Sequence, residues 1–270
     1  MAWWAELLLI AVVGVVSGAI NTIAGGGSLI TLPMLIFVGL PPGVANGTNR
    51  VGAVLQSSTA TVQFHREGLL NMALVRRLVL PTSIGAILGT WMSLGIDDDQ
   101  FQTIIGVMML IILPFVLLKP HKIDDENNDL PKNEGVVEAL AEDPATPGNN
   151  APLSPLLQAL LFFGIGVYGG FLQAGVGVFL LTGLVRGCGC DLVRSNGIKV
   201  ALVVVFASLA TLIFAWQGMI AWPTAAALAV GSMVGGWIGT KMTVSWGPKF
   251  IRAVLIVTVL LSASKLVGLW

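Results

Sequence analysis

Residues 21–28 read Asn-Thr-Ile-Ala-Gly-Gly-Gly-Ser, and residues 171–178, which follow 150 positions later, read Phe-Leu-Gln-Ala-Gly-Val-Gly-Val. The same shift superposes many small and polar residues in the rest of the two halves. The matched pairs are Gly25 with Gly175, Gly27 with Gly177, Asn46 with Asn196, Gly47 with Gly197, Gly68 with Gly218, Gly85 with Gly235, and Gly89 with Gly239. Because glycine is needed where a backbone bends sharply or packs closely, a shared glycine pattern indicates a shared backbone path. The chain is therefore predicted to be a duplicated unit.

The composition is that of a membrane protein. Hydrophobic residues make up 55% of the chain and charged residues 10%, and the mean hydropathy is +0.88. A spanning helix needs about 20 apolar residues, and such runs occupy 5–24, 47–64, 75–95, 101–118, 155–174, 197–217, 223–242 and 250–268. Two shorter runs, 28–40 and 178–187, are predicted to be half-helices or re-entrant segments. The predicted fold class is an all-α integral membrane protein with about eight full transmembrane helices and two short broken segments.

The middle of the chain has a different character. Residues 119–153 are rich in Asp, Glu, Asn and Pro and contain eight acids from Asp124 to Asp143, which is typical of a flexible aqueous linker. We therefore expect a first membrane repeat over 1–118, a linker over 119–153 and a second repeat over 154–270. The first residues, Met-Ala-Trp-Trp, have no basic start, so a cleaved signal peptide is not expected.

The basic residues indicate how the two halves are oriented. If each half crosses the membrane four times, the halves are parallel and the basic residues are divided almost evenly between the two sides. If the short run adds a segment that reverses direction, only Arg50 and Lys265 of the 14 basic residues lie away from one common side. Lys and Arg are enriched on the cytoplasmic side, so the second count is favoured. It predicts inverted repeats, both termini outside, and a cytoplasmic linker in a multi-pass protein of the bacterial inner membrane.

Inverted repeats with broken helices are typical of secondary transporters, in which the substrate binds near the midplane between the repeats. Here we expect breaks at 24–28 and 174–178, and further breaks at 45–49 and 195–199. Each break would place a helix N-terminus in the interior, where its partial positive charge suits an anion. The alternative is that these glycines and asparagines only allow helices to pack closely.

The first-half run Gly18 to Ser28 is followed by Pro33 and Pro41, by Asn-Gly-Thr-Asn at 46–49 and by Gly-Ala-Ile-Leu-Gly at 85–89. With weaker copies at 169–171 and 175–177, this pattern resembles the TauE/SafE sulfite exporter family, also called the TSUP transporters. The resemblance implies transport of small sulfur-containing anions such as sulfite, sulfoacetate or related organosulfonates. The second half departs from the first: it has no serine after its glycine-rich break, and it has Lys199 where the first half has Asn49.

The candidate substrate-binding residues lie at the breaks and in the polar positions beside them. Arg50 and Lys199 are one position apart in the repeat register, so two cations could converge on a sulfonate; alternatively, each side chain reaches its nearer membrane surface. Hydrogen bonds between helices are the alternative role for the uncharged residues. The full candidate set is Asn21, Gly25, Gly26, Gly27, Ser28, Asn46, Thr48, Asn49, Arg50, Gln173, Gly175, Gly177, Asn196 and Lys199.

All 14 acidic residues are expected outside the membrane interior, with Glu6 at the very start of the first span, so no intramembrane carboxylate is available to relay protons. A membrane potential of 100 mV, negative inside, favours loss of one negative charge by about 2.3 kcal/mol without any coupling ion. We therefore expect export driven by the potential through alternating access. A passive anion channel and an uptake carrier coupled to Na⁺ or H⁺ remain the alternatives.

Other functional classes lack the residues that they need. The chain has no HExxH motif and no intramembrane acid–base pair, so an enzyme is not expected, and its balanced charge does not favour nucleic-acid binding. Neither a cofactor nor a metal is expected, because Cys188 and Cys190 are too few for a closed zinc site. A thiol that forms a sulfur adduct and an unreactive apolar thiol both remain open for these cysteines. The expected partners are a small anion and the lipid bilayer, and a homo-oligomer stays open.

Overall fold

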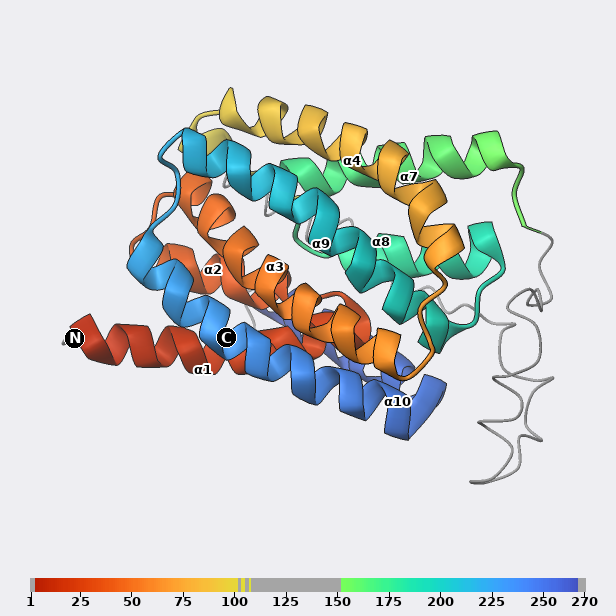
Figure 1. Cartoon of the computed structure of the whole chain (residues 1–270). Helices are drawn as coiled ribbons and strands as arrows, with labels where there is room; N and C mark the ends of the chain where they lie inside the picture. The colour runs from red at the N-terminus through yellow and green to blue at the C-terminus, as the bar shows by residue number, and fades with distance from the viewer. Residues whose placement is uncertain (1–2, 102, 105–106, 108–151, 267–270) are drawn as a thin grey trace.

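The computed structural model describes residues 3–101, 103–104, 107 and 152–266 (Figure 1). All regular structure in these residues is helical. The helices are α1 (Trp3–Ala24), α2 (Ser28–Phe37), α3 (Pro42–Arg66), α4 (Met72–Leu94), α7 (Pro155–Phe171), α8 (Val176–Thr182), the π-helical η1 (Gly183–Gly187), α9 (Leu192–Trp216) and α10 (Trp222–Leu266). Gly247, with φ 68° and ψ −163°, interrupts the helical geometry of α10.

The helix bounds follow the repeat in the sequence. Helix α9 is displaced from α3 by 150 residues at both ends, and α10 begins 150 residues after α4. The left-handed glycines in the turns between successive helices are displaced by the same number; the pairs are Gly25 and Gly175, Gly39 and Gly189, and Gly68 and Gly218. In Figure 1, α1 and α7 run in opposite directions, as do α3 and α9.

Most of the predicted apolar runs coincide with helices to within a few residues, including the short runs that became α2 and α8–η1. The predicted breaks at 45–49 and 195–199 are wrong, because both segments are helical. Pro42 takes the first position of α3 and Asp191 caps α9, so each helix begins before the Asn-Gly pair. Most of the predicted span 101–118 and of the linker 119–153 lies outside the described residues.

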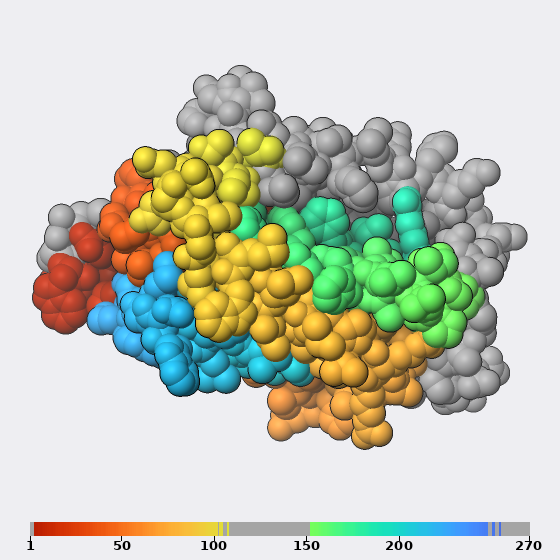
Figure 2. All heavy atoms as spheres, turned by 90° about the horizontal axis from the view of Figure 1, so that it is seen from above, coloured from red at the N-terminus to blue at the C-terminus, as the bar shows by residue number. Residues whose placement is uncertain are grey.

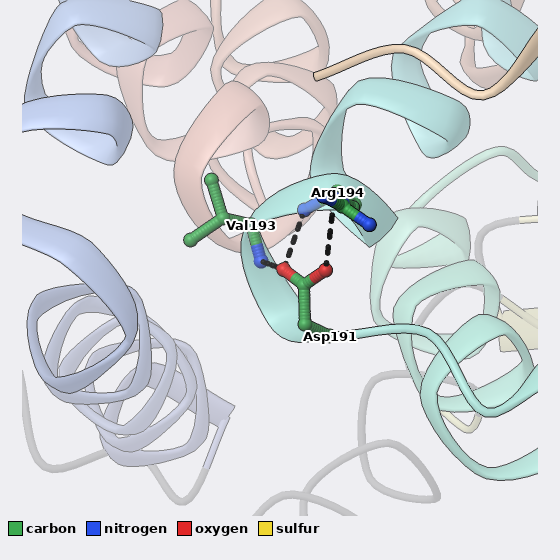
Figure 3. A network of polar contacts seen from close by, with 3 residues as sticks. All are labelled: Asp191, Val193 and Arg194. Atoms are coloured by element: carbon green, nitrogen blue, oxygen red, sulfur yellow. Dashed lines mark hydrogen bonds and ion pairs between the residues drawn. The ribbon is translucent and has the colours of Figure 1, made fainter. Parts of the chain in front are cut away.

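The start of α9 illustrates how these helices are fixed. One carboxylate oxygen of Asp191 accepts hydrogen bonds from the backbone N–H groups of Val193 and Arg194, both at 2.9 Å (Figure 3). The other lies 3.6 Å from Nε of Arg194. Asn71 and Ser154 cap α4 and α7 in the same way, each accepting from a backbone N–H three residues later. Caps of this kind satisfy the otherwise unpaired first-turn donors.

Each half packs its first helix against the fourth helix of the other half. Helix α1 lies along α10, and α4 lies along α7, as Figure 2 shows for the second pair. Glycines allow the α4–α7 contact: a Cβ at Gly89 would lie 1.9 Å from the carbonyl oxygen of Val167, and a Cβ at Gly170 would lie 2.0 Å from that of Ala86. Gly239, which matches Gly89, makes the corresponding contact between α10 and α1, where a Cβ would lie 2.7 Å from the carbonyl oxygen of Ala19. Helices that associate in lipid commonly use such small residues.

The polarity of the bundle is that of a membrane protein. Large apolar side chains are exposed along the outer helices, among them Leu80, Ile84, Leu88 and Trp91 of α4 and Leu156, Leu157 and Leu160 of α7. Polar and charged side chains are instead buried along α3 and α9. By length and composition, α1, α4 and α9 are each able to cross a membrane. The described residues therefore form an all-helical integral membrane protein.

Candidate functional site

The two glycine-rich breaks, far apart in sequence, touch each other in the bundle. The first separates α1 from α2, and the second separates α7 from α8. A Cβ at Gly25 would lie 2.4 Å from Cα of Gly177, and a Cβ at Gly177 would lie 2.3 Å from Cα of Gly25. Only glycine at both positions allows this backbone contact. The contact brings together the segments that the sequence pattern singled out.

Two small cavities adjoin this contact and share Asn21 and Ser28 in their walls. Each has a volume of about 10 Å³, which is room for about one water molecule. The site is therefore closed in this conformation. The other residues that line the first cavity are Ser57, Gln173, Val176, Gly177, Lys199, Val200 and Val203; those that line the second are Ser17, Gly18, Gly27, Thr31, Asn49, Ala53, Gln56 and Ser232.

Lys199 of α9 lies at the wall of the first cavity and is 1% exposed. Its ammonium donates to the carbonyl oxygens of Asn21 at 2.9 Å and Thr22 at 2.8 Å, and to Oδ1 of Asn196 at 2.6 Å. Two of these acceptors belong to the last turn of α1, where the helix dipole places negative charge. Because the side chain turns inward, the alternative in which it reaches the membrane surface is wrong.

Arg50 of α3 has the corresponding position at the end of α7, and it is also fully buried. It donates to the carbonyl oxygens of Gly169 at 3.1 Å and of Gly170, and it lies over the ring of Phe214 at 4.9 Å. Arg50 lines neither cavity. The two cations therefore do not converge on one cavity; each lies at the end of the broken helix of the opposite half.

The matched asparagines hold the same two helix ends. Nδ2 of Asn46 donates to the carbonyl oxygen of Phe171 at 2.9 Å, and Nδ2 of Asn196 donates to that of Ile23 at 3.0 Å. Thr48 accepts from the backbone N–H of Ala221 at 3.0 Å. These three predicted site residues connect helices and do not line either cavity.

Three more of the predicted glycines shape the turns at the breaks. The carbonyl oxygen of Gly26 accepts from the N–H of Leu29 at 3.1 Å, and that of Gly175 accepts from Val178 at 3.0 Å. Gly27, the residue before α2, lines the second cavity. The first turns of α2 and α8 thus lie beside the cavities, α2 through Ser28 and α8 through Gly177.

A network of uncharged side chains forms the wall along α3. Asn49 donates to Ser28 Oγ at 3.1 Å and accepts from the hydroxyl of Thr31 at 2.5 Å. Gln56 accepts from the amide of Asn21 and donates to the hydroxyl of Thr22, both at 2.6 Å. Gln56 was not among the residues predicted from the sequence. It lies seven positions after Asn49, a spacing that places both on one helix face, and this signal could have identified it.

Two buried polar groups at the first cavity have no hydrogen-bond partner among the described residues. They are Oγ of Ser57, which is 1% exposed, and Oε1 of Gln173, which is 2% exposed. Gln173 also has φ of 62°, a left-handed backbone that a non-glycine residue seldom adopts. An unpaired buried polar group commonly faces a water, an ion or a ligand. Ser57, which the sequence did not single out, lies eight positions after Asn49 on the same face.

The cysteines lie elsewhere, in the segment between η1 and α9, and line neither cavity. Both are free and partly buried. Burial raises the pKa of the Cys188 thiol to about 12 and that of Cys190 to about 11. At neutral pH both thiols are therefore protonated and poor nucleophiles, which favours the unreactive role over adduct formation.

A helical bundle with apolar outer faces, buried cations and two broken helices that meet at a polar cavity has the features of a membrane transporter. The chain belongs to the sulfite exporter TauE/SafE family, whose sequence model matches residues 10–266. It is 29% identical to a probable membrane transporter protein of Haemophilus influenzae, over 97% of this chain and 94% of that protein.

Other relatives carry similar descriptions. The chain is 26% identical to the probable membrane transporter protein YfcA of Escherichia coli K12, over 94% of this chain and 87% of that protein. It is 20% identical to the probable membrane transporter protein YunE of Bacillus subtilis, over 97% of both chains. No solved structure matches. The protein is thus an integral membrane transporter of this family and not an enzyme.

Proposed function

We propose that the protein is a secondary transporter that exports small sulfur-containing anions, of the sulfite, sulfoacetate or organosulfonate class, across the bacterial inner membrane. The observation that carries this proposal is the polar cavity at the contact between the two broken helices, with the ammonium of Lys199 in its wall. Positive charge and the first turns of α2 and α8 together make this place electrostatically suited to an anion. The family description supports the choice of sulfur anions.

We further propose that the two repeats, 1–118 and 154–270, are inverted in the membrane and joined by a cytoplasmic linker over 119–153. The opposite directions of α1 and α7, and of α3 and α9, support this arrangement (Figure 1). The distribution of Lys and Arg supports the same orientation. A pseudo-twofold arrangement allows alternating access, because each half can adopt the conformation of the other.

The predicted site residues then fall into two groups. Those that line the cavities form the walls of the anion site, together with Gln56 and Ser57; they are Asn21, Gly27, Ser28, Asn49, Gln173, Gly177 and Lys199. Lys199 contributes its positive charge from the wall, because its three N–H donors are bonded to oxygens of the protein. The others fix the backbone around the cavities: Gly25, Gly26, Asn46, Arg50, Gly175 and Asn196 lie at or hold the two breaks, and Thr48 holds the start of α10. A sulfonate needs more room than one water molecule, so binding requires the breaks to move apart.

The driving force in this proposal is the membrane potential. The buried charged side chains among the described residues are the cations Arg50 and Lys199. Their positive charge favours an anion as the transported species. A potential of 100 mV, negative inside, gives about a fiftyfold gradient for a monovalent anion. Flux should therefore follow an imposed potential and be indifferent to a pH gradient. A strict proton requirement would overturn this mechanism.

The test uses purified protein in lipid vesicles. Labelled sulfite or sulfoacetate should be transported with saturation and counterflow, which a passive channel does not give. Ser57→Ala removes the unpaired hydroxyl from the first cavity and should lower flux several-fold. Ser58→Ala is the matched control, because the Ser58 hydroxyl donates to the carbonyl oxygen of Val54 at 2.8 Å and lines neither cavity. Equal flux in the two variants would argue against this cavity as the binding site.

A further inference from the structure

The environment of the Lys199 ammonium has the form of a small cation site. Three oxygens surround Nζ: the carbonyl oxygens of Asn21 and Thr22, and Oδ1 of Asn196, at 2.6–2.9 Å. An ammonium has three N–H donors, so all three are used. All three acceptors are uncharged, and Lys199 makes no salt bridge in the described part of the chain.

These three oxygens, of Asn21, Thr22 and Asn196, form an oxygen cage at the end of α1. Helix α1 ends at Ala24, two residues after Thr22, and is followed by the left-handed Gly25. The end of a helix carries partial negative charge on its last carbonyl oxygens; that of Asn21 also accepts from the N–H of Gly25 at 2.9 Å. In secondary transporters with discontinuous helices, such carbonyl oxygens and half-helix ends coordinate the coupling cation. In this chain the site is filled by a side chain of α9.

The end of the other broken helix, α7, also binds a cationic side chain. Arg50 of α3 donates to the carbonyl oxygens of Gly169 and Gly170 at the end of α7. Each helix end thus receives a cation from the opposite half of the chain. Among the described residues, neither end has an acidic side chain that would attract a second, dissolved cation.

We propose that the Lys199 ammonium is a tethered replacement for a monovalent coupling cation, and that the oxygen cage formed by Asn21, Thr22 and Asn196 is a latent site for a free monovalent cation. If the proposed transport function holds, the cycle needs no dissolved cation, because the cation is part of the chain. Shortening the side chain of Lys199 empties the cage without removing its oxygens. A small cation from solution then enters it.

The experiment measures the thermal unfolding of the full-length protein in detergent, at constant ionic strength, in chlorides of choline, Na⁺, K⁺ and methylammonium. We expect the Tm of the wild-type protein to be the same in all four salts. Lys199→Ala should unfold several degrees lower in choline and should recover with saturation in methylammonium, because a ligand that binds only the folded state raises Tm by mass action. Lys199→Ala with Asn196→Ala should lose this recovery.

Lys241→Ala is the control for loss of a lysine charge, because Lys241 is exposed and lies over the ring of Trp237 at 3.8 Å. It should show no salt-specific change. Three results would overturn the proposal: a wild-type Tm that rises specifically with Na⁺ or K⁺, a Lys199→Ala variant with wild-type Tm in choline, or a variant that none of the small cations stabilises. None of these readouts depends on transport, so a failure of the sulfur-anion proposal would not affect them.

Discussion

Replacing Gly177 by alanine tests whether the two broken helices are in backbone contact. Gly177 has no left-handed φ and lies in the first turn of α8, so the effect of the added methyl group is steric. Its Cβ would lie 2.3 Å from Cα, 2.8 Å from the carbonyl oxygen and 3.0 Å from the carbonyl carbon of Gly25. Non-bonded carbon atoms are normally about 3.5–4.0 Å apart, so the two backbones must separate by about 1 Å.

Such overpacking costs about 1–3 kcal/mol. For a chain of this size each kcal/mol lowers Tm by about 2–4 °C. Gly164→Ala is the matched control: it is also a glycine in a helix and is exposed, and a Cβ there would meet no atom within 4 Å. Both variants replace a helical glycine by alanine, which raises helix propensity by at most about 1 kcal/mol, so a Tm of Gly177→Ala well below that of Gly164→Ala reports the clash.

The assay is thermal unfolding in detergent together with flux in vesicles. Gly177→Ala should unfold several degrees below Gly164→Ala and should transport roughly tenfold less, because a displacement of about 1 Å at a binding site is costly. If Gly177→Ala unfolds and transports like Gly164→Ala, the breaks are not in contact and the proposed cavity is not the site.

Two further predictions concern groups outside the cavities. Asp191→Ala removes the cap of α9 and should destabilise the protein by about 0.5–2 kcal/mol, seen as a lower Tm; an unchanged Tm would contradict the role of the cap in Figure 3. Cys188 and Cys190 should react with a maleimide at pH 8 at least roughly tenfold more slowly than a free thiol, since burial raises their pKa. Fast labelling at pH 8 would refute the raised pKa values. Because the thiols ionise at lower pH in the unfolded chain than in the folded protein, their burial also makes the free energy of unfolding fall as pH rises above about 9.

The sequence alone determined the class of protein and the repeat. Apolar runs of about 20 residues require lipid, and the spacing of 150 residues in the glycine pattern is found again in the helix bounds and the left-handed glycines. The breaks predicted at 24–28 and 174–178 are found at 25–27 and 172–175, since glycine is the residue that such turns need.

Helix propensity gave a wrong prediction where side chains form hydrogen bonds with distant helices. The segments 45–49 and 195–199 contain Asn, Gly and Ser or Thr, which are weak helix formers, and breaks were predicted there. Both are helical because Asn46 and Asn196 donate to the carbonyl oxygens of Phe171 and Ile23 in distant helices, and do not compete for their own backbone. The tertiary contacts override the propensity.

Only the tertiary structure decided the roles of the charged residues. The sequence predicted that Arg50 and Lys199 are special, and it allowed either convergence on an anion or extension to the membrane surface. The structure places each at the end of the broken helix of the other half, where the backbone acceptors lie 119 to 178 positions away in the chain. That Ser57 faces a cavity is likewise known only from the structure, in which residues of α1, α2, α8 and α9 line the same cavity. A sequence specifies which groups are available, but which oxygen each donor meets depends on how the helices pack, and that is a property of the whole fold.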